Sequence, residues 1–151
     1  MTTGKQLFTT LAPDGTLTVE VAETDFPAPT GNQVLVRIHA VGVCHTDLAF
    51  KGRVPGAAVF GHEGAGVVES VGAAVAGIVV GDRVVLSFRS CGQCRHCTAH
   101  LPSYCTKGAL LNMSGARSDG TPTLRRNGAG LFGAFFGQSS FAEYAIATRD
   151  N

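Results

Sequence analysis

The 151-residue sequence contains no tryptophan and almost no excess of charge of either sign. Twelve lysines and arginines are balanced by eleven aspartates and glutamates, and no stretch concentrates the basic residues. This balance argues against a dedicated nucleic-acid-binding protein, which needs a positively charged surface. No apolar run approaches the roughly 20 residues that cross a bilayer, and the N-terminus has no apolar signal segment. We therefore expect a cytoplasmic protein with neither a nucleic acid nor a membrane as partner.

Helical periodicity is also scarce along the chain. Short runs of β-branched residues recur instead, separated by Gly, Pro, Asn and Asp, which is the pattern of an all-β barrel or sandwich. The expected strands are 17–21, 34–40, 64–71, 83–86 and 141–148. The pattern at 46–51 predicts one short helical turn. We expect 87–106 and 113–133 to lie outside the barrel. With no repeat and no linker, we expect one mainly β domain over 1–151, too short to include a dinucleotide-binding domain as well.

Four of the five cysteines are crowded into fifteen residues. Cys91, Cys94, Cys97 and Cys105 follow the order C-x2-C-x2-C-x7-C. Thiols at such spacing can converge on one zinc ion and complete a tetrahedron. Disulfides are the first alternative, disfavoured without an export signal. An iron–sulfur cluster is the second, but the bacterial ferredoxin pattern places its fourth cysteine three residues on, followed by proline. Four thiolates leave zinc no open position, so this ion would stabilise the loop rather than react.

The fifth cysteine, Cys44, stands far upstream in an apolar context. A lone thiol of this kind is more often a small buried hydrophobe than a ligand. Its neighbours favour the second interpretation, because a hydroxyl and the carboxylate of Asp47 follow closely and His62 comes eighteen residues later. Cysteine and histidine ligands that leave a coordination position free are what a catalytic zinc requires. Asp47 would then orient an imidazole as its hydrogen-bond partner.

Several motifs together resemble a known family. Segments 61–66 (GHEGAG), 81–84 (GDRV), the four-cysteine stretch and 136–144 (FGQSSFAEY) occur in the order seen in zinc-dependent alcohol dehydrogenases of the medium-chain dehydrogenase/reductase family. The resemblance runs from about residue 31 to the end of the chain. Segments 87–91 (SFRSC) and 112–115 (NMSG) are most similar to bacterial benzyl (aryl) alcohol dehydrogenases. The resemblance implies a GroES-like, partly open β-barrel with short helices, a zinc-binding lobe at about 87–106, and no Rossmann domain in this chain.

The resemblance also assigns roles at the reaction centre. It makes Cys44 and His62 two of the three protein ligands of a catalytic zinc and Glu63 a carboxylate that approaches the metal during ligand exchange. Zinc lowers the pKa of a bound alcohol, Thr46 accepts its proton, and hydride passes to the nicotinamide of NAD. Asp47 remains the partner of the imidazole. The expected reaction is oxidation of a primary, aromatic or otherwise apolar alcohol to an aldehyde.

Three further positions follow from the same resemblance. His45 corresponds to a basic residue that helps to hold the cofactor pyrophosphate, and Phe88 and Phe135 fall near positions that line the substrate pocket. One position departs from the pattern, because Ala49 stands where some relatives carry the last histidine of the proton relay. Proton release must then use water or another group.

Part of the family's machinery is absent from this sequence. The third catalytic ligand is a cysteine near the start of the dinucleotide-binding domain, and no cysteine follows Cys105. We therefore expect one firmly held zinc rather than two, a chain that is inactive by itself, and a full enzyme that is a homo-oligomer. Two other hypotheses stay open: a zinc-stabilised GroES-like interaction module without catalytic activity, and a hydrolase that uses zinc-bound water at Cys44 and His62.

Overall fold

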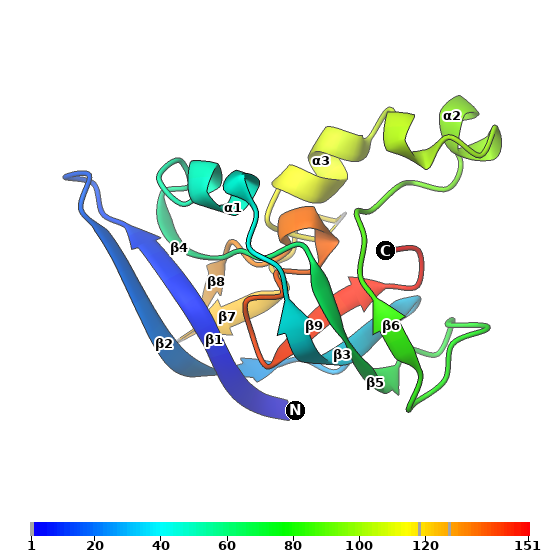
Figure 1. Ribbon diagram of the computed structural model, residues 1–151, viewed down its shortest axis with the longest axis horizontal. Coiled ribbons are helices and arrows are strands. Elements are labelled where there is room, and N and C mark those ends of the chain that lie inside the picture. Colours follow the sequence, from blue (N-terminus) through cyan, green and yellow to red (C-terminus); the bar gives the residue numbers. More distant parts are fainter. Residues whose placement is uncertain (1, 118, 127) are drawn as a thin grey trace.

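The computed structural model describes residues 2–117, 119–126 and 128–151, which form a β-barrel with short helices on its rim (Figure 1). One sheet has the strand order β4 (Gly56–Val59), β1 (Thr2–Leu11), β2 (Leu17–Phe26), β7 (Leu124–Arg126) and β8 (Ala129–Leu131). The other has the order β6 (Arg83–Val85), β5 (Gly64–Val71), β3 (Gln33–Val41) and β9 (Tyr144–Thr148). All strand pairs within the two sheets are antiparallel, so the described residues contain no doubly wound parallel sheet.

Two isolated bridges add to the pairing between the named strands. A bridge between Gln6 and Ala142 links β1 to the segment before β9, and one between Ala58 and Phe132 links β4 to the segment after β8. One cluster of buried apolar side chains draws on both sheets and consists of Phe8, Phe26, Leu35, Val59, Leu124 and Ile146. This shared core is the reason that the two sheets close into one barrel.

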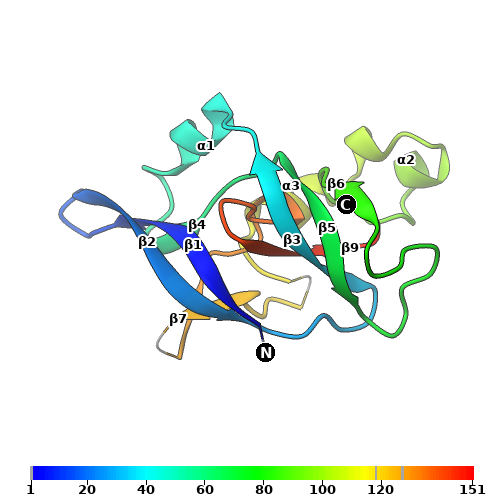
Figure 2. The same ribbon diagram turned by 60° about the horizontal axis from the view of Figure 1, so that its bottom comes forward.

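The helices are short and lie at the ends of strands. They are α1 (His45–Phe50), α2 (Arg95–Thr98), α3 (Gly108–Met113), and the 3-10 turns η1 (Pro102–Tyr104) and η2 (Phe135–Gly137). In both ribbon views the lobe that carries α2 projects from the barrel on the side away from the β1–β2 hairpin (Figure 2). None of the helices in the described part of the chain has both the length and the apolar character needed to span a bilayer.

The predicted fold is confirmed, and most of its predicted elements are present. Each of the five expected strands lies in or overlaps a real strand, and the expected helical turn is α1. One prediction is wrong: residues 113–133 do not lie wholly outside the barrel, because they contribute β7 and β8 to the first sheet. Strands of three residues are too short to show an alternating pattern. The strand β1 was also missed, because its inward positions include Gly4 and Gln6 rather than apolar residues.

Candidate metal centres

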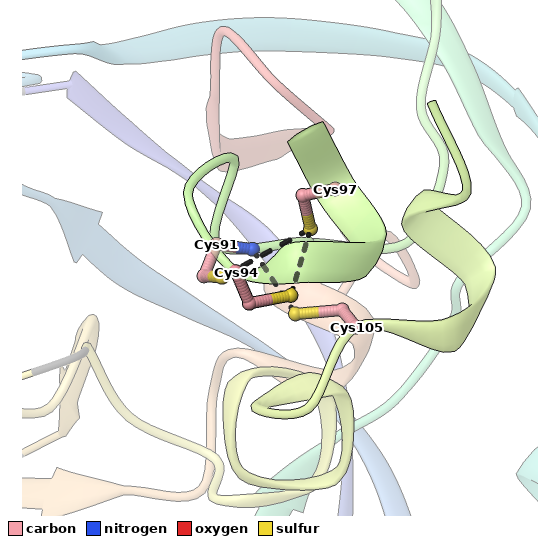
Figure 3. Close-up of side chains that lie close together, drawn as sticks. All are labelled: Cys91, Cys94, Cys97 and Cys105. Atoms are coloured by element: carbon pink, nitrogen blue, oxygen red, sulfur yellow. Dashed lines mark hydrogen bonds between the residues drawn. The ribbon is translucent and has the colours of Figure 1, made fainter. Parts of the chain in front are cut away.

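The four clustered cysteines converge on a single point in the lobe (Figure 3). Their sulfur atoms all lie within 4.8 Å of one another. The Sγ of Cys97 is 3.5 Å from the Sγ of Cys94 and 3.9 Å from that of Cys91. A tetrahedral zinc with bonds of about 2.3 Å to four sulfurs requires sulfur–sulfur distances of about 3.8 Å. The donor set and its spacing therefore fit one zinc ion closed off by four thiolates.

Backbone N–H groups prepare this cluster for a cation. The N–H groups of Cys97 and Thr106 stabilise the Cys94 thiolate and lower its pKa to about 5. The backbone N–H of Gln93 likewise lowers the pKa of Cys91, whereas desolvation raises the pKa of Cys97. Since zinc binds the thiolate form, the lobe already favours the metal-binding form of Cys91 and Cys94 before a metal binds.

Side-chain amides attach the lobe to the barrel. Asn112 of α3 is buried, accepts a hydrogen bond from the backbone N–H of Arg89 (2.8 Å), and donates to the carbonyl oxygens of Arg89 (2.9 Å) and Gly108 (2.7 Å). Gln138, only 1% exposed, donates to the carbonyl oxygens of Ser87 (3.1 Å) and His62 (2.9 Å). Gln138 thus ties the start of the lobe to the segment that carries His62.

The second group of possible ligands lies where α1 begins. Cys44 is the N-cap of α1, and its Sγ accepts a hydrogen bond from the backbone N–H of Thr46 at 3.5 Å. The carboxylate of Asp47 accepts one from the backbone N–H of Cys44 at 3.0 Å, which completes a capping box. The hydroxyl oxygen of Thr46 is 3.6 Å from the sulfur of Cys44. The helix start therefore places a thiol and a hydroxyl side by side.

His62 and Glu63 reach the same place from the turn between β4 and β5. The turn depends on Gly61, whose φ of 90° is left-handed and whose Cα faces the backbone nitrogen of Phe141, which an added Cβ would approach to 2.5 Å. One ligand atom each from Cys44, His62 and Glu63 lies within 4.8 Å of the other two. Thiolate, imidazole and carboxylate are all zinc ligands, and three of them leave a tetrahedral position open.

Asp47 holds the two halves of this group together. It is 3% exposed, and its Oδ1 accepts hydrogen bonds from the backbone N–H of Gly61 (2.9 Å) and pairs with Nδ1 of His62 (3.1 Å). Its Oδ2 accepts the hydrogen bond from the backbone N–H of Cys44. One buried carboxylate thus connects the N-cap of α1 to the His62 turn. Because Nδ1 of His62 is engaged by Asp47, Nε2 is the nitrogen left to bind a metal.

Aromatic side chains form the wall behind His62. The fully buried Phe135 meets the imidazole edge-to-face at 5.5 Å between ring centroids. Phe136 stacks on it at 4.5 Å with an interplanar angle of 22°. The half-buried Phe88 lies at the start of the lobe, between β6 and Cys91, and His45 is exposed in the first turn of α1. The cofactor and substrate roles of these residues stay predictions.

Sequence reasoning missed two residues of this site. Phe136 was overlooked because nothing in the sequence indicates that both of two adjacent phenylalanines contact the same histidine. Gln138 was overlooked because its three partners, including the N–H of Gly64 at 3.1 Å, are far from it in the chain. The FGQSSFAEY motif contained both residues, and it was the only signal that could have found them.

Comparison with known proteins gives consistent matches. Residues 30–151 match the alcohol dehydrogenase GroES-like domain. Geraniol dehydrogenase of Castellaniella defragrans is 47% identical over 140 residues, which cover 91% of this chain and 37% of that protein. Alcohol dehydrogenase class-3 of Drosophila melanogaster is 37% identical over 131 residues, covering 83% of this chain and 34% of that protein.

Solved structures agree with the sequence relatives. Benzyl alcohol dehydrogenase from Acinetobacter calcoaceticus has a TM-score of 0.87 and 37% identity, with all of this chain and 40% of that chain covered. An alcohol dehydrogenase zinc-binding domain protein from Burkholderia ambifaria has a TM-score of 0.84 and 43% identity, with 97% and 41% covered. The chain therefore spans 34–41% of the length of these relatives.

Proposed function

Because the chain belongs to the family defined by the alcohol dehydrogenase GroES-like domain, we propose that it supplies the metal-binding part of a zinc- and NAD-dependent alcohol dehydrogenase. In this proposal residues 1–151 form one domain, with a structural zinc lobe at 87–106. The substrate is a primary alcohol with an aromatic or other apolar group, and the product is the aldehyde. The names of the benzyl alcohol and geraniol dehydrogenases support this substrate class.

One observation carries the proposal: Cys44, His62 and Glu63 offer three zinc-ligand atoms within 4.8 Å of one another, separate from the four-cysteine lobe. A closed four-thiolate site cannot accept a substrate oxygen, whereas the mixed site can. A zinc ion bound there acts as a Lewis acid that makes an alcohol hydroxyl more acidic. In this proposal the four-cysteine site stabilises the lobe, and the mixed site binds the reacting alcohol.

The surrounding residues of the chain would bind and orient the reactants. The Thr46 hydroxyl would accept the proton of the alcohol, and its position next to the Cys44 sulfur supports this role. Asp47 keeps the proton of His62 on Nδ1, and the buried aromatic wall that includes Phe135 excludes water on one side. Glu63 is exposed beside the two ligands and can serve as a replacement ligand. Ala49 offers no side chain for a proton relay, so the Thr46 hydroxyl would pass its own proton to water as it accepts that of the alcohol.

The cofactor and the remaining partners are part of the same proposal. His45, exposed beside Thr46, would contact the pyrophosphate of NAD. Since the described residues contain no parallel nucleotide-binding sheet, a Rossmann domain would bind most of the NAD, in an enzyme that assembles as a homo-oligomer. Phe88, at the base of the lobe, would border the alcohol. Cysteines that serve as metal ligands fit a reducing compartment such as the cytoplasm.

The proposal is tested by loading the chain with zinc at the lobe and then titrating Co²⁺, followed by its visible absorption. We expect a second, weaker metal site that is lost in Cys44→Ser and His62→Ala. Benzyl alcohol should shift the cobalt bands of the wild-type protein. Cys97→Ser is the matched control, because it removes a thiol from the lobe and should remove the first metal instead. A second site that survives in both Cys44→Ser and His62→Ala would contradict the proposal.

A further inference from the structure

Phe136 makes the closest aromatic contact of His62. Its ring is nearly parallel to the imidazole, with centroids 4.5 Å apart, whereas Phe135 presents an edge at 5.5 Å. Phe136 and Phe135 are themselves edge-to-face at 4.9 Å. The imidazole is therefore covered on one face by Phe136 and flanked by the perpendicular ring of Phe135.

The backbone of Phe136 is in a conformation that phenylalanine rarely adopts. Its φ is 51° and its ψ is 29°, in the left-handed region that favours glycine. The neighbouring turn holds it there. Ser139 is fully buried, its hydroxyl oxygen accepts the backbone N–H of Phe135 at 2.9 Å, and its hydroxyl donates to the carbonyl oxygen of Val59 at 2.6 Å. A bulky residue in such a conformation persists where its surroundings enforce it, and these positions cluster at functional sites.

The orientation of His62 needs more than its hydrogen bond to Asp47. That bond fixes Nδ1 at one point, 3.1 Å from Oδ1, but the terminal torsion of a histidine side chain has broad minima. An imidazole held at one point can still tilt, and tilting changes the direction in which Nε2 points. A ring stacked on the imidazole face removes this freedom.

We propose that Phe136 is a positioning residue for the second metal site: its ring fixes the plane of His62 so that Nε2 faces the sulfur of Cys44. This inference rests on the proposed function, because it concerns the same metal site. The left-handed backbone at Phe136 is the conformation that turns the side chain toward the imidazole. Asp47 selects which nitrogen is free, and Phe136 determines where that nitrogen points.

The test compares three variants of the whole chain with zinc already bound at the lobe. Phe136→Leu removes the aromatic face, and Phe136→Tyr keeps it. Phe132→Leu is the matched control, because Phe132 belongs to the same cluster and its ring contacts are with Phe60 and Phe135. Two quantities are measured: the dissociation constant of Co²⁺ at the second site, and the proton chemical shifts of the His62 ring, which a stacked aromatic ring moves upfield without any metal.

We expect Phe136→Leu to weaken Co²⁺ binding about tenfold, as loss of a supporting contact to a ligand does, and to abolish the upfield shift. Phe136→Tyr and Phe132→Leu should keep both near wild type. Unchanged Co²⁺ binding in Phe136→Leu would overturn the positioning role and leave the proposed function intact. Equal weakening in Phe132→Leu and Phe136→Leu would also overturn it, because the cause would then be general packing. A wild-type chain with no second metal site would overturn both.

Discussion

Replacing Asp47 tests the link between the two halves of the mixed metal site. The carboxylate accepts hydrogen bonds from the backbone N–H groups of Cys44 (3.0 Å) and Gly61 (2.9 Å) and contacts Nδ1 of His62 at 3.1 Å. Asp47→Ala leaves these groups without an acceptor. A buried unsatisfied donor costs about 1–3 kcal/mol. Water can reach the partly exposed Cys44, so the expected loss of unfolding free energy is about 3–5 kcal/mol.

Asp47→Asn separates the acceptor function from the charge. The amide keeps one oxygen, which can accept hydrogen bonds either from Gly61 and His62 or from Cys44. Its N–H₂ group then faces the donors that have lost their acceptor. We expect a smaller loss of about 1–3 kcal/mol. Metal affinity at the second site should fall about 10–100-fold, because the amide no longer supports the imidazole as an anion does.

The measurement is urea unfolding of the zinc-loaded chain, with the midpoint and the slope compared between variants. Asp82→Ala is the control, since Asp82 accepts the N–H of Val79 at 2.8 Å in an exposed turn. It should lose about 1 kcal/mol or less. The reasoning is refuted if Asp47→Ala loses no more than this control with an unchanged slope, because the carboxylate would then not be holding the two segments together.

Three other outcomes are expected. Cys97→Ser or a strong chelator should remove the lobe zinc, whose binding free energy in comparable sites is about 10–16 kcal/mol, and open 87–106 to proteolysis. Gly42→Ala should displace Glu63, whose Oε2 would lie 2.0 Å from the new Cβ. Its flexible carboxylate can move, so Co²⁺ binding should change with little change in the urea midpoint. In the metal-free chain the N–H groups of Cys97 and Thr106 lower the pKa of Cys94 to about 5. The Cys94 thiolate therefore stabilises the folded chain. That stabilisation is complete above the ordinary thiol pKa and lost as pH falls through about 5. Zinc uptake at pH 7, followed with a pH indicator, should therefore release fewer than four protons.

The lobe was the part most accessible to sequence reasoning. Four cysteines within fifteen residues can meet only by local folding, so their spacing alone predicts the cluster, and the structure brings their sulfurs within 4.8 Å. The strands with clear alternation, such as β3 and β5, were predicted for a similar local reason. β7 and β8 were not, because three-residue strands are stabilised by their neighbours in the sheet and not by their own pattern.

The mixed site shows the opposite case. Cys44 and His62 were suggested by residue type and by resemblance, but nothing in the spacing required them to meet. Asp47 joins the start of α1 to the turn before β5, and Phe136 contacts His62 from a segment more than seventy residues away. Hydrogen bonds and ring contacts of this range are products of barrel closure.

By itself, the sequence determined a mainly β chain and a lobe of four clustered cysteines, because these features depend on periodicity and short spacing. Its residue types also suggested a second group of metal ligands. Only the tertiary structure decided which nitrogen of His62 is free and which aromatic ring stacks on it. It also decided that one carboxylate joins the two segments of the site. Local patterns record what each segment can form alone, whereas orientation within a site depends on partners that only the closed barrel brings into contact.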